Sequence, residues 1–255
     1  MRAEYDLSQN TTAWAAFGIR ETTEVNSLAN ITVTNASTGA ANTRKADNYR
    51  EDLVKSGEVG LRSKLRTGSI GHTLVASASI YRLDSKNAFS YSPAGGLLTN
   101  MYNPIQRPAP ATNSPTGGIM WHPLVTSKKD FVSVAIGDTI SFADDRALLT
   151  IGVRNQTIEA TSYQATTGAM TSGYDKSRTS PVVGMVWKAN NSVSLYANYI
   201  ESLSQGPTAA TVGAITPTNL GEIFSPYVSK QKEIGAKYDG GKFGGGLAYF
   251  TTKKP

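Results

Sequence analysis

The sequence predicts an all-β protein, an antiparallel meander of about ten long strands that forms part of a transmembrane β-barrel. Three observations predict this fold. Segments of alternating apolar and polar residues come in pairs, short turns join the two members of each pair, and long polar connections separate the pairs. Transmembrane barrels have strands of period two, short periplasmic turns and longer extracellular loops. The order of segments in this sequence is therefore the one that such a barrel requires.

The composition agrees with this fold class. Of 255 residues, 39% are hydrophobic and 17% are charged, and 24 are glycine. This mixture favours β structure with polar loops over a helical or doubly wound fold. With no cysteine and only two histidines, the chain has no disulfide framework or thiolate metal site, and little scope for histidine-based catalysis. The net charge of +6 comes without a dense Lys/Arg run, so a nucleic-acid partner is not expected.

The expected strands form five hairpins. Their residue ranges are 1–7 with 11–24, 53–66 with 72–83, 128–142 with 146–160, 178–188 with 193–203, and 229–239 with 242–252. The expected long loops are 26–52, 84–127, 164–176 and 204–228. Loops beyond about 15 residues are uncommon in compact domains and indicate functional segments.

The strand faces are chemically different. Val132, Val134 and Ile136 alternate with Ser133 and Ala135. In the last hairpin, Ile234, Ala236 and Tyr238 share one face, and Asp239–Lys242 reads as a tight turn that pairs Tyr238 with Phe243. Both strands of each hairpin then turn their apolar side chains to the same side. A sheet with lipid on one side and water on the other needs this arrangement, and only a closed barrel pairs every backbone group in hydrocarbon.

The segment from Asn191 to Pro255 closely resembles the barrel of TonB-dependent ferric-siderophore receptors. In that family a strand of the type "vSlYanY" precedes a loop, a strand of the type "P…s.Q.E.G.K.d" and a strand ending in "F…rP". The matching positions are Ser194, Tyr196, Asn198, Tyr199, Gly206, Pro226, Ser229, Gln231, Glu233, Gly235, Lys237, Phe250 and Pro255. The rest of the chain matches in its rhythm of strands and loops.

The resemblance implies a receptor in the bacterial outer membrane rather than an enzyme. Such a receptor imports a ferric siderophore with energy from the TonB-ExbB-ExbD complex, which acts through a plug domain inside the barrel. Iron would arrive already chelated, so no cofactor is implied, and lipid and lipopolysaccharide would surround the barrel. Residues 1–255 are interpreted as a partial barrel domain from the middle of a receptor, because the plug and the C-terminal strands of the family are missing.

Two sets of residues are candidates for the binding site. Loop aromatics offer rigid surfaces for a chelate; they are Tyr91, Tyr102, Trp121, Tyr163, Tyr174, Phe224 and Tyr227. Basic residues expected to face the lumen could attract an anionic chelate or pair with carboxylates of the plug and neighbouring strands; they are Arg62, Lys64, Arg66, Arg154 and Lys237. His72 and His122 lie 50 residues apart without ligand-spaced partners, so no metal site is expected.

Three other functions remain open from the sequence. A passive porin would share the short turns and long loops without the motif in residues 229–239. An outer-membrane enzyme would need a clustered nucleophile and base. A soluble β-rich adhesin or fibre would bury its apolar face against a second layer instead of lipid.

Overall fold

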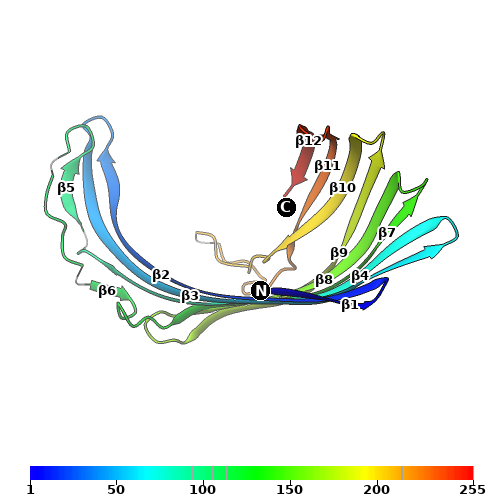
Figure 1. Ribbon diagram of the computed structural model, residues 1–255. Helices are drawn as coiled ribbons and strands as arrows, with labels where there is room; N and C mark the ends of the chain where they lie inside the picture. Colours follow the sequence, from blue (N-terminus) through cyan, green and yellow to red (C-terminus); the bar gives the residue numbers. More distant parts are fainter. Residues whose placement is uncertain (94, 105, 113, 214, 255) are drawn as a thin grey trace.

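The computed structural model describes residues 1–93, 95–104, 106–112, 114–213 and 215–254 (Figure 1). Twelve strands form one sheet that is bent into an open trough. Their bounds are β1 Arg2–Ser8, β2 Thr11–Asn35, β3 Ala40–Thr67, β4 Ile70–Tyr91, β5 Leu97–Asn100, β6 Ser114–Gly117, β7 Val125–Phe142, β8 Ala147–Tyr163, β9 Met170–Lys188, β10 Val193–Ser204, β11 Tyr227–Asp239 and β12 Gly244–Lys253.

Ten of these strands form the predicted antiparallel meander. Their order in the sheet is β1-β2-β3-β4-β7-β8-β9-β10-β11-β12, while the short strands β5 and β6 pair with β3 and β4 outside this path. The five predicted hairpins are all present and each is closed by a short turn. No helix in the described part of the chain is long and apolar enough to cross a membrane.

Two of the four predicted long loops are wrong. Most of 26–52 belongs to β2 and β3, which continue side by side up to a four-residue turn at 36–39. Likewise β9 begins at Met170, inside 164–176, and β8 continues to Tyr163, so that only a six-residue turn at 164–169 remains. The β-branched run around Ile31, Thr32 and Val33 favours this extension, although the alternation there no longer separates apolar from polar. The connections 92–124 and 205–226 are long, as predicted.

The last hairpin has a different register from the predicted one. Tyr238 pairs with Gly245 rather than Phe243, and Asp239 pairs with Gly244. The turn therefore spans four residues, with Gly241 at φ 79° and the Gly241 amide donating to the Asp239 carboxylate at 2.9 Å. Because the shift is two residues, each side chain stays on its predicted face: Ile234 pairs with Tyr249 and Ala236 with Leu247.

The sheet is a single layer. Only five apolar side chains among the described residues are buried, and they are scattered over four strands: Ala41, Ala88, Ala147, Ile158 and Tyr174. Large aliphatic side chains are instead exposed, such as Val134 at 57% and Ile136 at 61%. A soluble sandwich would bury this face against a second sheet, so the apolar face needs a nonaqueous partner.

Candidate functional site

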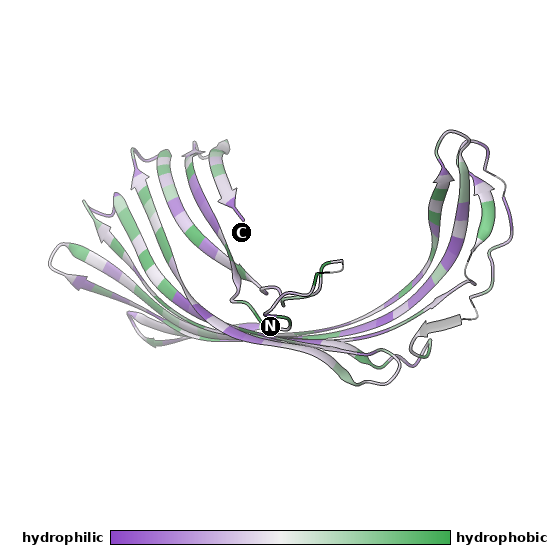
Figure 2. Cartoon of the chain, turned by 180° about the vertical axis from the view of Figure 1, so that it is seen from behind, coloured by the Kyte–Doolittle hydropathy of each residue, from purple (hydrophilic) through white to green (hydrophobic). Residues whose placement is uncertain are grey.

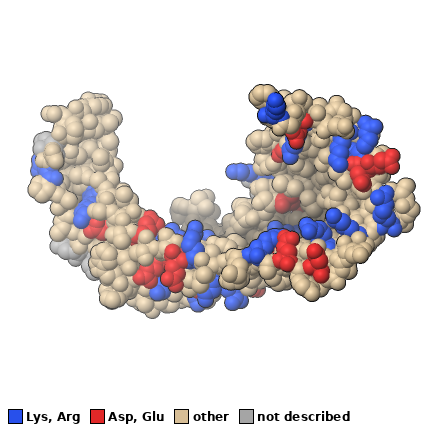
Figure 3. All heavy atoms as spheres, in the orientation of Figure 1, with Lys and Arg blue, Asp and Glu red and all other residues tan. Residues whose placement is uncertain are grey.

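The two faces of the trough carry different side chains, as the banding along the strands in Figure 2 shows. The continuous registers fix which residues share a face: Ser79 pairs with Ser133, and Ser133 pairs with Gln156. Ser133 is 5% exposed, and its hydroxyl lies 2.8 Å from that of Ser79. We call this polar side the concave face. Charged side chains are visible along the floor and right-hand wall of the trough in Figure 3.

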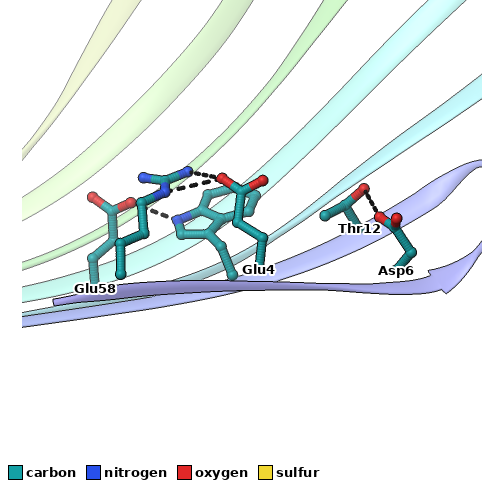
Figure 4. Close-up of polar contacts among 6 residues, drawn as sticks. Glu4, Asp6, Thr12 and Glu58 are labelled. Atoms are coloured by element: carbon teal, nitrogen blue, oxygen red, sulfur yellow. Dashed lines mark hydrogen bonds and ion pairs between the residues drawn. The ribbon is translucent and has the colours of Figure 1, made fainter.

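A network of polar groups lies on the concave face of β1, β2 and β3. The Arg2 guanidinium contacts the Glu4 carboxylate at 2.8 Å and lies 5.7 Å from the ring centre of Trp14. The Trp14 indole Nε1 in turn donates to Glu58 at 2.6 Å. Figure 4 shows Glu4, Asp6, Thr12 and Glu58 rising from the same side of the strands. Trp14 was not predicted to take part; its neighbour across the strand pair, Gly60, leaves the space that its ring occupies.

A second cluster surrounds Tyr196 and explains the motif in β11. The Tyr196 hydroxyl donates to Glu233 at 2.7 Å, and Gln231 Nε2 donates to the other oxygen of that carboxylate at 3.2 Å. The Lys237 ammonium lies 5.4 Å from the centre of the Tyr196 ring. Gly235 pairs directly with Tyr196, and the ring lies across it. The residues at 231, 233, 235 and 237 alternate along β11 because all of them contact or support one aromatic ring.

The five candidate basic residues lie on the concave face by register. Arg62 pairs with Thr12 and Val75, and Arg154 pairs with Ala135 and Ser180. Lys64, Arg66 and Lys237 follow the same alternation in β3 and β11. Among the described residues none of the five forms an ion pair with a carboxylate. Arg154 donates instead to Ser133 Oγ at 2.9 Å. The alternative of pairing with neighbouring-strand carboxylates is therefore not seen in this part of the barrel.

Four of the seven candidate aromatics are in strands rather than loops, which corrects their predicted placement. Tyr91 ends β4, Tyr163 ends β8, and Tyr227 begins β11. Tyr174 lies inside β9, where it is 4% exposed. The cause is again the extension of strands beyond the apolar band, into segments that composition alone marked as loops. Tyr91 stacks under the Arg44 guanidinium at 5.1 Å.

The three loop aromatics are held separately. The Tyr102 hydroxyl donates to the Ala36 carbonyl at 2.6 Å, which ties the long connection to the β2–β3 turn. Trp121 packs on Tyr49 with ring centres 4.8 Å apart, and Tyr49 lies on the face of β3 opposite Arg62. Phe224 lies in the 205–226 connection and is 38% exposed. No ring contact joins any two of the seven within the described residues, so they do not form one aromatic cluster.

The histidines have different surroundings. His72 Nδ1 lies 2.7 Å from Asp138 Oδ2, a partner that the sequence did not indicate because β7 is brought beside β4 only by the fold. His122 lies in the long connection near Trp121. The described residues contain no group of three or more metal-ligating side chains.

The architecture defines a class of protein. The sheet is a single-layer antiparallel meander with an exposed aliphatic face and a polar concave face. This combination is that of the wall of an outer-membrane β-barrel. The family model "TonB dependent receptor-like, beta-barrel" matches residues 1–254. The chain belongs to this family of outer-membrane receptor barrels, whose members are transport receptors rather than enzymes.

Individual relatives agree with this assignment. The ferrichrome receptor FcuA of Yersinia enterocolitica is 33% identical over the whole chain, which covers 33% of that protein. The ferrichrome outer membrane transporter/phage receptor of Escherichia coli K12 is 29% identical over 70% of the chain, which covers 22% of that protein. The crystal structure of BauA, the ferric preacinetobactin receptor of Acinetobacter baumannii, superposes with a TM-score of 0.81 at 34% identity, and the chain covers 36% of it. The chain thus spans about a third of the length of FcuA and BauA.

Proposed function

We propose that this chain forms a middle section of the barrel of a receptor that imports ferric siderophores across the outer membrane with energy from TonB. The observation that carries the proposal is the match of the receptor-barrel family to residues 1–254. The Tyr196 cluster supports it, because the alternating motif of β11 has a defined place on the concave face. The remaining strands and the plug domain would come from other parts of the receptor.

Transport of this kind needs no catalytic residue in the barrel wall. Basic groups of the concave face such as Arg62 and Arg154 form no ion pair with a carboxylate of the described residues, and they would attract an anionic chelate. Iron would pass as cargo inside the siderophore, so the barrel needs no cofactor. TonB-ExbB-ExbD would act through the plug, and lipid and lipopolysaccharide would cover the aliphatic face.

The chelate itself is the open part of the proposal. The receptors named above take different ligands by their names: ferrichrome for FcuA and ferric preacinetobactin for BauA. Both relatives are about equally similar to this chain. The binding test therefore needs both chelates.

The proposal is tested by expressing the complete receptor in a siderophore-receptor-deficient strain. Uptake of radioactive iron from ferrichrome and from ferric preacinetobactin is then measured with and without a functional TonB. We expect saturable uptake of at least one chelate that disappears without TonB. A passive porin, the alternative function, would instead admit small sugars and chelates without saturation and independently of TonB, and that result would overturn the proposal.

A further inference from the structure

The ladder between β9 and β10 ends halfway along the strands. These strands pair only from Lys188–Ser194 to Val182–Ile200. Beyond this point β9 continues to pair with β8, and β10 continues to pair with β11. Figure 1 shows the divergence: the β8–β9 hairpin continues along the floor of the trough, whereas β10 leads to the 205–226 connection.

Pro181 explains where the ladder ends. It directly precedes Val182, the first residue of β9 that pairs with β10. Proline has no N–H to donate, so it is found in sheets at edges and at breaks in the ladder. On its β8 side Pro181 keeps its place opposite Val153. From Met170 to Pro181, the side of β9 that faces β10 is therefore an unpaired edge, although β9 lies in the interior of the sheet.

The divergence opens a pocket of about 470 Å³ in the wall. Its polar lining includes Arg154 and Gln156 of β8, Ser180 of β9 and Ser202 of β10, with Val182 and Ile200 as apolar neighbours. Farther along the diverging strands, the Tyr174 hydroxyl accepts a hydrogen bond from the Gly206 amide at 3.1 Å and joins β9 to the segment that follows β10. A pocket of this size is within the range of small-molecule sites.

Two features of the pocket lining favour the binding of an anion. Arg154 is an exposed guanidinium on the concave face, and among the described residues its only hydrogen-bond partner is Ser133 Oγ, which leaves further N–H groups to donate. Ser180 is 8% exposed, and its hydroxyl has no hydrogen-bond partner among the described residues. Buried polar groups are nearly always paired, so this hydroxyl indicates a site for a bound group. The carboxylate in the lining is Glu201, whose Oε1 already accepts from the Tyr199 hydroxyl at 2.7 Å.

We propose that the opening at Pro181 is a binding site for an anionic small molecule. Arg154 is its charge partner, and Ser180 and Gln156 donate hydrogen bonds. The inference rests on the proposed function in one respect: the natural occupant is taken to be the anionic arm of a ferric chelate. Charge-assisted hydrogen bonds to guanidinium are among the strong ones, so removal of Arg154 is expected to dominate the loss of affinity.

The test uses single cysteines in the complete receptor, since this chain contains none of its own. Gln156→Cys places a thiol in the pocket, and Ser56→Cys places one on the concave face of β3 outside it. The rate of maleimide labelling is measured with ferric citrate, with iron-free citrate and with ferrichrome, a chelate without net charge. We expect both citrate forms to slow labelling at position 156 at least threefold, to leave position 56 unchanged, and ferrichrome to have a smaller effect.

Second substitutions identify the groups responsible. Arg154→Gln should raise the citrate concentration needed for protection at least tenfold, whereas Arg20→Gln, on the same face of β2 outside the pocket, should change it less than twofold. Pro181→Val restores a backbone donor and should reduce protection by letting the ladder extend. Absence of protection by citrate, or equal effects of the two arginine substitutions, would overturn the proposed anion-binding site. These readouts do not depend on iron uptake, so a failed transport assay would leave them unchanged.

Discussion

The ring of Tyr196 lies across the backbone of Gly235 on the neighbouring strand. A Cβ atom at position 235 would fall 2.6 Å from ring carbons of Tyr196 and 2.7 Å from the Leu247 carbonyl oxygen. Both approaches are closer than real Cβ atoms make. Glycine is therefore required at 235 by the ring on one side and the next strand on the other.

Gly235→Ala is expected to destabilise the complete barrel by about 1–3 kcal/mol, the usual cost of overpacking a fitted site. The measurement is the urea midpoint of the receptor in lipid vesicles. Gly245→Ala is the matched control, because nothing lies within 4 Å of a Cβ built there. Equal midpoints for the two variants would contradict the role given to Gly235.

The turn between β7 and β8 stores backbone strain. Ala143, Asp144 and Asp145 all have left-handed φ angles of 54° to 61°, which cost a non-glycine residue about 1 kcal/mol. Ala143 has no side-chain oxygen to offset that cost. We expect Ala143→Gly to stabilise the barrel by about 0.5–1 kcal/mol. Ala147→Gly is the control. Ala147 lies four residues later in extended backbone and is fully buried, so this substitution should destabilise the barrel in the same urea titration. A lower midpoint for Ala143→Gly would refute the claim that the turn is strained.

Tyr174 anchors the 205–226 connection to β9 through the Gly206 amide. Tyr174→Phe leaves that amide without its partner, which costs about 1–3 kcal/mol locally. Amide exchange of Gly206, Thr208 and Ala209 should therefore speed up about tenfold or more while exchange in β9 stays unchanged. Tyr163→Phe is the control, since the Tyr163 hydroxyl makes no hydrogen bond to described residues. Unchanged exchange at Gly206 in Tyr174→Phe would show that the anchor lies elsewhere.

Acid is expected to release the segment before β6 from β3. The hydrogen bond from Thr112 lowers the pKa of the Asp47 carboxyl below its usual value, and Lys45 at 3.1 Å acts in the same direction. A carboxyl with a lowered folded-state pKa stabilises the contact above its ordinary pKa, near 4, and this stabilisation is lost as the pH falls through the folded-state pKa.

A nitroxide at Ala111→Cys can report this release. Its spectrum should show restricted motion at pH 7, and the motion should become faster as the pH falls from the ordinary carboxyl pKa, about 4, through the lower folded-state pKa of Asp47. Thr112→Val removes the donor and should give the fast spectrum at both pH values. A pH-independent restricted spectrum in the unmodified background would rule out Asp47 as the tether.

The sequence was sufficient for much of the fold, for a physical reason. Where one face meets lipid and the other meets water, every second side chain is constrained, so the pairs around Val134 and Ile234 could be placed on their faces. Beyond the membrane both faces meet water and that constraint disappears. The extensions of β2–β3 and of β8–β9, the second of which carries Tyr163 and Tyr174, therefore lack the alternation that predicts a strand.

The site was predicted less well because its contacts join distant segments. Glu58 accepts a hydrogen bond from the Trp14 indole across β2 and β3. Glu233 accepts one from the Tyr196 hydroxyl across β10 and β11. The sequence shows the alternation of Gln231, Glu233 and Gly235 but not the ring they surround. Pro181 lies within an expected strand of the sequence, but its effect appears only in the fold, where β10 diverges from β9.

The central claim is that the aliphatic face contacts lipid while the concave face contacts water. The most direct measurement places a nitroxide at Val134→Cys or Ala135→Cys in the complete receptor in lipid vesicles. Spectral saturation then gives the collision rates with oxygen and with a water-soluble nickel chelate. We predict that position 134 collides mainly with oxygen and position 135 with the nickel chelate. Equal nickel accessibility at both positions, or the reverse order, would contradict the assignment of the two faces.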